Sequence, residues 1–175
     1  MGNMGSIQRI TILISALFRT AASQVSSFHG DEDDPFNPLV DLGYVKYRGY
    51  SNLTAGINYF KGIHYAASPS GTYRWRKPRP IEWNNGFDTN SIYNATDHAA
   101  PCIQTVPEPY YALGFNEDYS SDGQSEDCLT LDVLAPTHRQ SEYVPVVVLI
   151  HGGGYDQGGS RWFQGESMVN ASNGR

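Results

Sequence analysis

The strongest constraint on the fold of this chain is a run of five apolar residues, Val146–Ile150, that ends abruptly in His151 and three consecutive glycines. A short apolar run rich in β-branched residues and bounded by turn-forming residues is typical of a buried β-strand. A strand without polar alternation must be covered on both faces, as in the interior of a sheet flanked by helices. The pattern therefore predicts an α/β fold in which Val146–Ile150 is an interior strand.

The glycines Gly152–Gly154 leave the backbone bare directly after that run. Glycine adopts conformations closed to other residues, and it places no side chain between a ligand and the backbone N–H groups. Such N–H groups can stabilise an oxyanion that develops during acyl transfer. In isolation the same glycines are equally consistent with a tight turn that has no chemistry. Nucleotide binding is disfavoured, since Gln157 replaces the third glycine of GxGxxG and Gly159 replaces the lysine of a Walker A loop.

Three further blocks precede the glycines, and the four together identify a family. They are Phe60–Pro80 (FKGIHYAASPSGTYRWRKPRP), Asp97–Gln104 (DHAAPCIQ), Ser125–Pro136 (SEDCLTLDVLAP) and His151–Gly159 (HGGGYDQGG). In this order and at these spacings, they resemble the type-B carboxylesterase/cholinesterase family of α/β-hydrolases. The resemblance extends from about residue 39 to about residue 169, and Ser125–Pro136 is its most specific block.

This resemblance implies an α/β fold class: the N-terminal portion of an α/β-hydrolase fold, incomplete, with an edge β-hairpin followed by the first central strands. It implies that Gly153 and Gly154 donate their backbone N–H groups to the oxyanion. Tyr155, where the family usually has phenylalanine, is a candidate for the substrate pocket, and it is equally consistent with a packing aromatic. His151 is expected to be structural, because the catalytic histidine of this fold follows the nucleophile and the acid.

The resemblance also implies two structural pairs in the upstream blocks. Cys102 and Cys128, the only cysteines of the chain, occupy the positions that the family joins in a disulfide. Arg74 and Glu126 occupy positions that form an ion pair in relatives. The alternative for the second pair is two solvated surface charges that contribute about 0–1 kcal/mol.

The residues of a catalytic triad are not expected in this chain. No GxSxG motif occurs, and the nearest sequence, Gly165–Val169 (GESMV), has Val169 where a nucleophile elbow needs glycine. Ser167 is therefore expected to be an ordinary surface or helix serine. The chain is interpreted as the N-terminal fragment of a serine carboxylic-ester hydrolase that is inactive alone. A non-catalytic, cholinesterase-like binding or adhesion protein and an inactive truncated product remain alternatives.

The chain divides into three regions on composition. Residues 1–23 have a basic residue, an apolar stretch and small residues suited to cleavage, which predicts a secretory signal peptide. Residues 24–38 are acidic and are expected to be flexible. Residues 39–175 form the esterase-like region, truncated before the nucleophile elbow. An extracellular location agrees with the even cysteine count and with three candidate N-glycosylation sites, at Asn52, Asn94 and Asn170.

Other elements are expected from composition. Leu39–Tyr47 and Ala55–His64 are predicted strands, separated by a turn over Arg48–Thr54. Leu129–Leu134 is a further predicted strand, and a helix is expected to begin within Gly165–Asn170.

Charge and residue spacing exclude several classes of partner. The net charge is −6, and there is no basic run suited to phosphate contacts, so nucleic acid is not an expected partner. No histidines and cysteines lie at metal-ligand spacing, so neither a metal nor another cofactor is predicted. The apolar stretch near the N-terminus is too short to span a membrane. The expected partner of the full-length enzyme is a small-molecule carboxylic ester, and the oligomeric state is undetermined.

Overall fold

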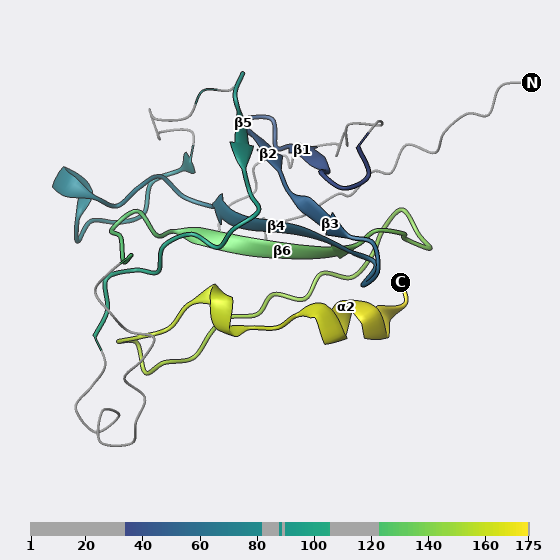
Figure 1. The fold of residues 1–175 in the computed structure, drawn as a ribbon. Helices are drawn as coiled ribbons and strands as arrows, with labels where there is room; N and C mark the ends of the chain where they lie inside the picture. The colour runs from purple at the N-terminus through teal and green to yellow at the C-terminus, as the bar shows by residue number, and fades with distance from the viewer. Residues whose placement is uncertain (1–33, 82–87, 89, 106–122, 175) are drawn as a thin grey trace, which may run out of the picture.

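The computed structural model describes residues 34–81, 88, 90–105 and 123–174. The described chain forms two small β-sheets, with the C-terminal segment running along one side of them (Figure 1). The predicted signal peptide and most of the acidic segment 24–38 lie outside the described residues. The described end of that segment is hydrogen-bonded, because Asp34 accepts the N–H of Phe36 at 2.9 Å through its side chain.

The first sheet contains β1 (Leu39–Asp41), β2 (Lys46–Arg48) and β5 (Ile92–Asn94) in the order β1-β2-β5. The first two strands are antiparallel, and β5 pairs with β2 in parallel. A turn joins β1 to β2, in which the Asp41 carboxylate accepts the N–H of Gly43 at 2.8 Å. This turn divides the predicted strand Leu39–Tyr47 into two short ones.

The second sheet contains β3 (Tyr50–Asn52), β4 (Ile57–His64) and β6 (Thr130–Pro136), all antiparallel. The hairpin of β3 and β4 matches the predicted edge hairpin. However, the turn predicted over Arg48–Thr54 is shorter than expected, because Tyr50–Asn52 pairs with β4.

The strands predicted at Ala55–His64 and Leu129–Leu134 are confirmed as β4 and β6. In β4 the pairing register shifts between Phe60 and Ile63, which marks a β-bulge. Gly62 lies in this bulge with φ of +70°, a left-handed conformation that favours glycine.

One core connects the two sheets. Its buried members come from both of them: Val40, Val45, Tyr47, Phe60, Ile63 and Ala95. Phe60 is 1% exposed, and its ring is so close to the chain between β2 and β3 that a Cβ atom at Gly49 would lie 2.7 Å from it. The close approach of the backbone to this ring requires glycine at position 49.

The interior strand predicted at Val146–Ile150 is wrong for this structure. The five residues form no strand, and their side chains are 46–84% exposed. A strand exists only where its backbone groups pair with a neighbour, and β6, the edge strand of its sheet, pairs with β4 alone. Local composition met the requirement for a strand, but no described segment supplies the pairing partner.

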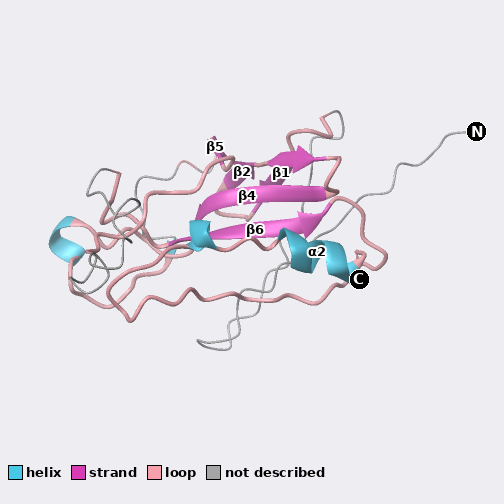
Figure 2. Cartoon of the chain, turned by 60° about the horizontal axis from the view of Figure 1, so that its bottom comes forward, coloured by secondary structure: helices cyan, strands magenta, loops and turns pink. Residues whose placement is uncertain are grey.

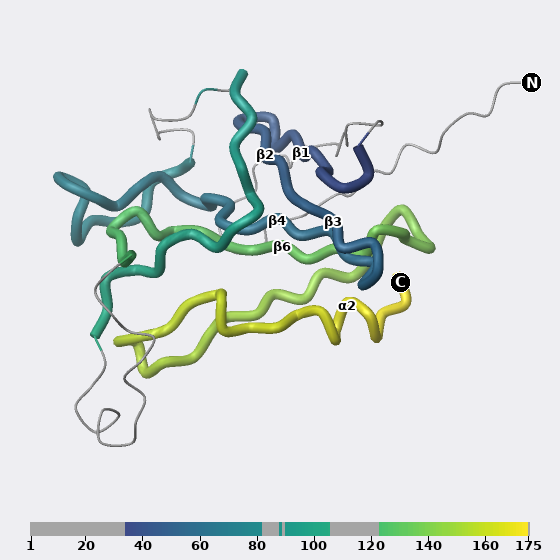
Figure 3. The backbone as a smooth tube through the Cα atoms, viewed as in Figure 1, coloured from purple at the N-terminus to yellow at the C-terminus, as the bar shows by residue number. Residues whose placement is uncertain are grey.

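The C-terminal part returns along β6. After a short 3₁₀ turn, η3 (Ser160–Trp162), the chain enters the helix α2 (Glu166–Ser172). The helix lies beside β6 (Figure 2), and a Cβ atom at Gly165 would lie 3.5 Å from the side chain of Leu134. The predicted helix start within Gly165–Asn170 is confirmed. The tube in Figure 3 shows the glycine-rich segment between residues 151 and 159 at the far end of this return path from α2.

Candidate functional site

The glycine-rich loop, defined here as residues 151–159, is a compact turn. The carbonyl oxygen of Gly153 accepts the N–H groups of Asp156 and Gln157, both at 3.2 Å. Three successive residues, Gly153, Gly154 and Tyr155, have φ values of +134°, +67° and +70°. Glycine at positions 153 and 154 allows these positive φ values with little steric strain, because other residues are disfavoured in the left-handed region.

Two glycines of the loop are also required by close contacts. A Cβ atom at Gly153 would collide with the carbonyl oxygen of Gln157. A Cβ atom at Gly158 would collide with the imidazole of His151. The loop therefore closes on itself, with Gly158 against His151, and any larger side chain at either glycine would open it.

The backbone N–H groups of Gly153 and Gly154 donate no hydrogen bond to any residue in the described ranges. Gly153 is half-buried and Gly154 is exposed. Adjacent amides that have no internal acceptor can donate to an anionic ligand. Tyr155 is fully exposed, so it is not packed against the described residues.

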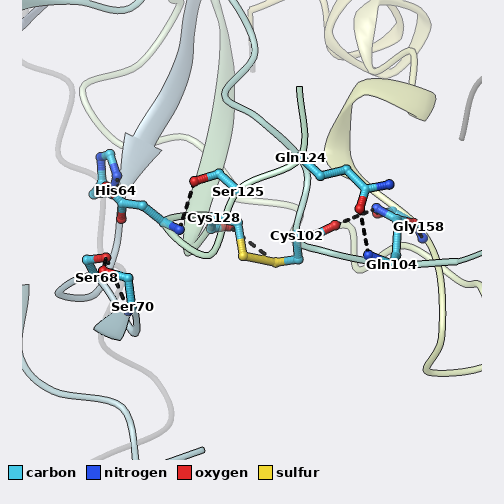
Figure 4. The surroundings of a disulfide bond; sticks show 10 residues. His64, Ser68, Ser70, Cys102, Gln104, Gln124, Ser125, Cys128 and Gly158 are labelled. Atoms are coloured by element: carbon cyan, nitrogen blue, oxygen red, sulfur yellow. Dashed lines mark hydrogen bonds and ion pairs between the residues drawn. A yellow bond between two sulfur atoms is a disulfide. The ribbon is translucent and has the colours of Figure 1, made fainter. Parts of the chain in front are cut away.

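A disulfide joins the two upstream blocks beside the loop (Figure 4). Cys102 and Cys128 are bonded, with Cα atoms 5.0 Å apart. Next to them the N–H of Ser125 donates to the carbonyl oxygen of Pro101 at 2.9 Å. The two segments are thus held together by one covalent bond and by backbone pairing.

Gln104 belongs to the site, although no sequence pattern predicted it. Its side-chain amide contacts Gly158 of the glycine-rich loop through two hydrogen bonds, of 2.6 and 3.1 Å (Figure 4). The two residues are 54 positions apart. No local pattern marks such a contact, and the only signal was that Gln104 ends the first cysteine block.

The ion pair expected from the resemblance is present in the structure. Nε of Arg74 lies 2.7 Å from Oε1 of Glu126, and the other carboxylate oxygen accepts the N–H of Gly71 at 3.4 Å. The Arg74 side chain is 56% exposed and that of Glu126 is 29% exposed. At this exposure, solvent screening limits the pair to about 0–1 kcal/mol. The Glu126 carboxylate thus contacts both the Arg74 side chain and the backbone of Gly71.

Two histidine–carboxylate pairs include residues of β4 or β6, and neither pair contains a nucleophile. Nδ1 of His98 lies 2.8 Å from Asp132, and Nε2 of His64 lies 3.3 Å from Asp127. Within the described ranges, no group of three or more histidine, cysteine or acidic side chains could hold a metal ion. No helix in the same ranges is long and apolar enough to cross a membrane.

The remaining sequence candidates are surface residues. Ser167 is exposed on α2, and its hydroxyl is not hydrogen-bonded to a histidine or carboxylate of the described residues. All three candidate glycosylation sites are exposed: Asn52, Asn94 and Asn170. The side-chain oxygen of Asn94 accepts the N–H of Thr96, the third residue of its own triplet, at 3.3 Å.

The fold and loop define part of an α/β-hydrolase of the esterase type. A family model described as Carboxylesterase family matches residues 37–173, and the chain belongs to that family. Cocaine esterase from Homo sapiens is 34% identical over 167 residues, which are 94% of this chain and 27% of that protein. Cholinesterase from Mus musculus is 32% identical over 134 residues, which are 75% of this chain and 21% of that protein.

Solved structures agree with this assignment. The crystal structure of EstA from Aspergillus niger matches with a TM-score of 0.61 and 30% identity, and it covers 79% of this chain and 24% of that chain. The predicted fold class, an N-terminal portion of an α/β-hydrolase, is thereby confirmed. The chain spans about a quarter of the length of the relatives that it matches.

Proposed function

We propose that this chain supplies the oxyanion loop of a serine carboxylic-ester hydrolase, with Gly153 and Gly154 as the donors. The observation that carries the proposal is the pair of adjacent amides without a described acceptor, on a turn closed by glycine contacts. Membership of the carboxylesterase family supports it, because the turn falls in the matched region. The substrate class is a small-molecule carboxylic ester.

In the proposed reaction a serine attacks the ester carbonyl and a histidine takes the serine proton. The carbonyl oxygen becomes an oxyanion, which the N–H groups of Gly153 and Gly154 stabilise. Each such donor lowers the barrier by roughly 2.7–4 kcal/mol. The chain contains no GxSxG motif, so the serine, the histidine and the orienting acid are proposed to come from outside these 175 residues. No cofactor is needed for this chemistry.

We further propose that the protein is secreted and glycosylated. A disulfide between Cys102 and Cys128 suits an oxidising compartment. Three exposed glycosylation triplets and the apolar stretch near the N-terminus support the same location. Expression in a secretory cell line tests this proposal. The chain is expected in the medium, and glycosidase treatment is expected to lower its apparent mass. Retention in the cytosol, or no change on treatment, would contradict it.

A loop graft tests the donors directly. Residues 151–159 are placed into the matching loop of para-nitrobenzyl esterase from Bacillus subtilis, which is 36% identical to this chain over 118 residues. The grafted enzyme is expected to keep its kcat within about tenfold. A second graft carrying Gly153→Ala is expected to lose roughly 10²–10³ in kcat, because the added Cβ displaces the donors. A folded graft without activity would overturn the assignment.

The chain by itself provides the second test. With a short-chain nitrophenyl ester, its 175 residues are expected to give no turnover above a heat-denatured control. A serine-directed phosphonate is expected to leave no adduct, since Ser167 lies exposed on a helix and is not hydrogen-bonded to a described histidine. An adduct on any serine would place a nucleophile within this chain and overturn the proposed division of the site.

A further inference from the structure

The side-chain amide of Gln104 is hydrogen-bonded to both backbone polar groups of Gly158, in the way that the backbone of a neighbouring β-strand would be. The N–H of Gly158 donates to Oε1 of Gln104 at 2.6 Å, and Nε2 of Gln104 donates to the carbonyl oxygen of Gly158 at 3.1 Å. Both backbone groups of one residue are thereby satisfied by a single amide (Figure 4). Because Gly158 is buried, loss of these bonds would leave two polar groups without a partner in the described residues.

Gln104 is itself held by residues outside the glycine-rich loop. Its backbone N–H donates to Oε1 of Gln124 at 2.9 Å, and its Nε2 also donates to the carbonyl oxygen of Cys102 at 3.1 Å. Cys102 is bonded to Cys128. The side-chain amide has two hydrogens and one oxygen, and all three have a partner in this arrangement. The disulfide-linked segments thus fix the position and the rotamer of Gln104.

Gly158 in turn fixes both ends of the glycine-rich loop. Its φ is +136°, and a Cβ atom built on it would lie 2.6 Å from the carbonyl oxygen of Gly152 and against the ring of His151. Nδ1 of His151 lies 2.9 Å from that same oxygen of Gly152. A residue that holds Gly158 therefore also limits the movement of the turn between Gly152 and Gly158.

We infer that Gln104 is a positioning residue that holds the amides of Gly153 and Gly154 in their donor geometry. It does not touch the reacting atoms, and it acts through Gly158. Its catalytic consequence rests on the proposed function, whereas the clamp between Gln104 and the loop does not. A donor displaced by more than about 0.5 Å loses its productive geometry toward the oxyanion, and a rigid support outside the loop limits that displacement.

Amide hydrogen exchange on the oxidised 175-residue chain tests the clamp. In the wild type, the Gly158 amide is expected to be protected, as are the strands β4 and β6. Gln104→Met keeps the length of the side chain and removes its hydrogen bonds. It is expected to speed exchange in residues 152–158 roughly 10- to 100-fold while β4 and β6 stay unchanged. Gln140→Met is the matched control, since the Gln140 amide donates to the carbonyl oxygen of Asn173 instead.

Gln104→Glu separates positioning from packing. An ionised carboxylate can accept the N–H of Gly158 but cannot donate to its carbonyl oxygen, whereas a protonated carboxyl group can do both. Loop protection in this variant, corrected for intrinsic exchange, is expected to be low near pH 7 and to recover toward pH 4, near the usual glutamate pKa. The wild type measured at the same pH values controls for every effect of pH on the loop that does not depend on residue 104.

Three results would overturn the inference. They are an unprotected Gly158 amide in a wild-type chain whose β4 and β6 are protected, unchanged loop exchange in Gln104→Met, and a pH-independent loop in Gln104→Glu. If exchange in Gln104→Met also becomes faster in β4 and β6, that variant no longer isolates the loop. The protection of the wild-type Gly158 amide and the pH dependence in Gln104→Glu then still test the inference. Exchange needs no substrate or nucleophile, so failure of the loop graft would remove the proposed function and leave the clamp standing.

Discussion

The carboxylate of Asp132 in β6 accepts the backbone N–H of Gly62, in the bulge of β4, at 2.8 Å. Its second oxygen contacts Nδ1 of His98 at 2.8 Å, and the side chain is only 9% exposed. Gly62 lies at φ of +70°, and a Cβ there would lie 3.1 Å from the carbonyl oxygen of Asp97. One side chain therefore joins the bulge to the neighbouring strand and to the segment that precedes Cys102.

Replacement of Asp132 is predicted to weaken the bulge, and the loss depends on whether the new side chain can still accept the N–H of Gly62. Asp132→Ala leaves the N–H of Gly62 without its partner, which costs about 1–3 kcal/mol of the free energy of unfolding. Asp132→Asn keeps an acceptor for the N–H of Gly62, so a smaller loss is expected. Urea unfolding of the three proteins measures the difference. Equal losses in both variants would refute the role assigned to the hydrogen bond.

The disulfide is predicted to contribute more stability than any single surface contact. Cys102 and Cys128 are 26 positions apart, and closing a loop of that length contributes roughly 3.5 kcal/mol in the chain-entropy model. Mass spectrometry of the non-reduced chain should find the two peptides linked. Cys102→Ser with Cys128→Ser should lower the free energy of unfolding by a similar amount. Two separately alkylated thiols in the native chain would contradict the bond.

The Arg74–Glu126 pair is predicted to orient the two side chains and to contribute little to the free energy of unfolding. Because the arginine side chain is 56% exposed, a double-mutant cycle with Arg74→Ala and Glu126→Ala should give a coupling of about 0–1 kcal/mol. The coupling should shrink further in 1 M salt. A coupling above about 2 kcal/mol would show that the pair is buried in solution.

Local sequence patterns predicted those strands whose formation depends mainly on residues close together in the sequence. The β-type composition of Ala55–His64 and of Leu129–Leu134 predicted strands there, and β4 and β6 lie in the structure as expected. The family blocks led to the fold class, which the solved structures confirm. The assignments of Gly153 and Gly154 remain proposals, since they depend on a substrate.

The features that the sequence did not predict, such as β5 and the contact of Gln104 with Gly158, depend on pairing between segments far apart in the sequence. β5 has only three residues and exists because Tyr93 pairs with Tyr47 across the chain. The contact of Gln104 with Gly158 spans 54 positions and involves one side chain. Val146–Ile150 shows the converse, since its composition favours a strand and the described chain has no partner for it. Local pattern decides propensity, and only tertiary pairing decides whether a strand forms.

Tyr47 is predicted to make stability fall at alkaline pH. Burial raises the pKa of its hydroxyl above the ordinary value of 10.0, and the side chain is 2% exposed. A raised pKa in the folded state means a contribution that is fully present below pH 10 and is lost as pH rises through the folded value. The stability difference between wild type and Tyr47→Phe should therefore shrink above about pH 10.

Urea midpoints measured from pH 8 to pH 11 test the prediction for Tyr47. Tyr155→Phe is the control, because Tyr155 is fully exposed and packs against none of the described residues. Contributions of the other tyrosines are common to all variants and cancel in the difference. A difference between wild type and Tyr47→Phe that stays constant with pH would show that the hydroxyl of Tyr47 is not held in its neutral form by the fold.

The exposed run Val146–Ile150 is predicted to make these 175 residues self-associate. Val148 is 77% exposed and Ile150 is 84% exposed, and an unpaired apolar segment of this kind can pair with the same segment of another chain. Val148→Lys should reduce association without lowering the urea midpoint, because no packing is lost. The substitution moves the net charge of −6 toward zero, so greater overall repulsion cannot explain a gain in solubility. Sedimentation velocity should show the shift toward monomer, whereas Ser141→Lys, which adds the same charge outside the run, should not. Persistent association of Val148→Lys, or a loss of more than about 1 kcal/mol in its unfolding free energy, would mean that the run is already covered in the folded chain.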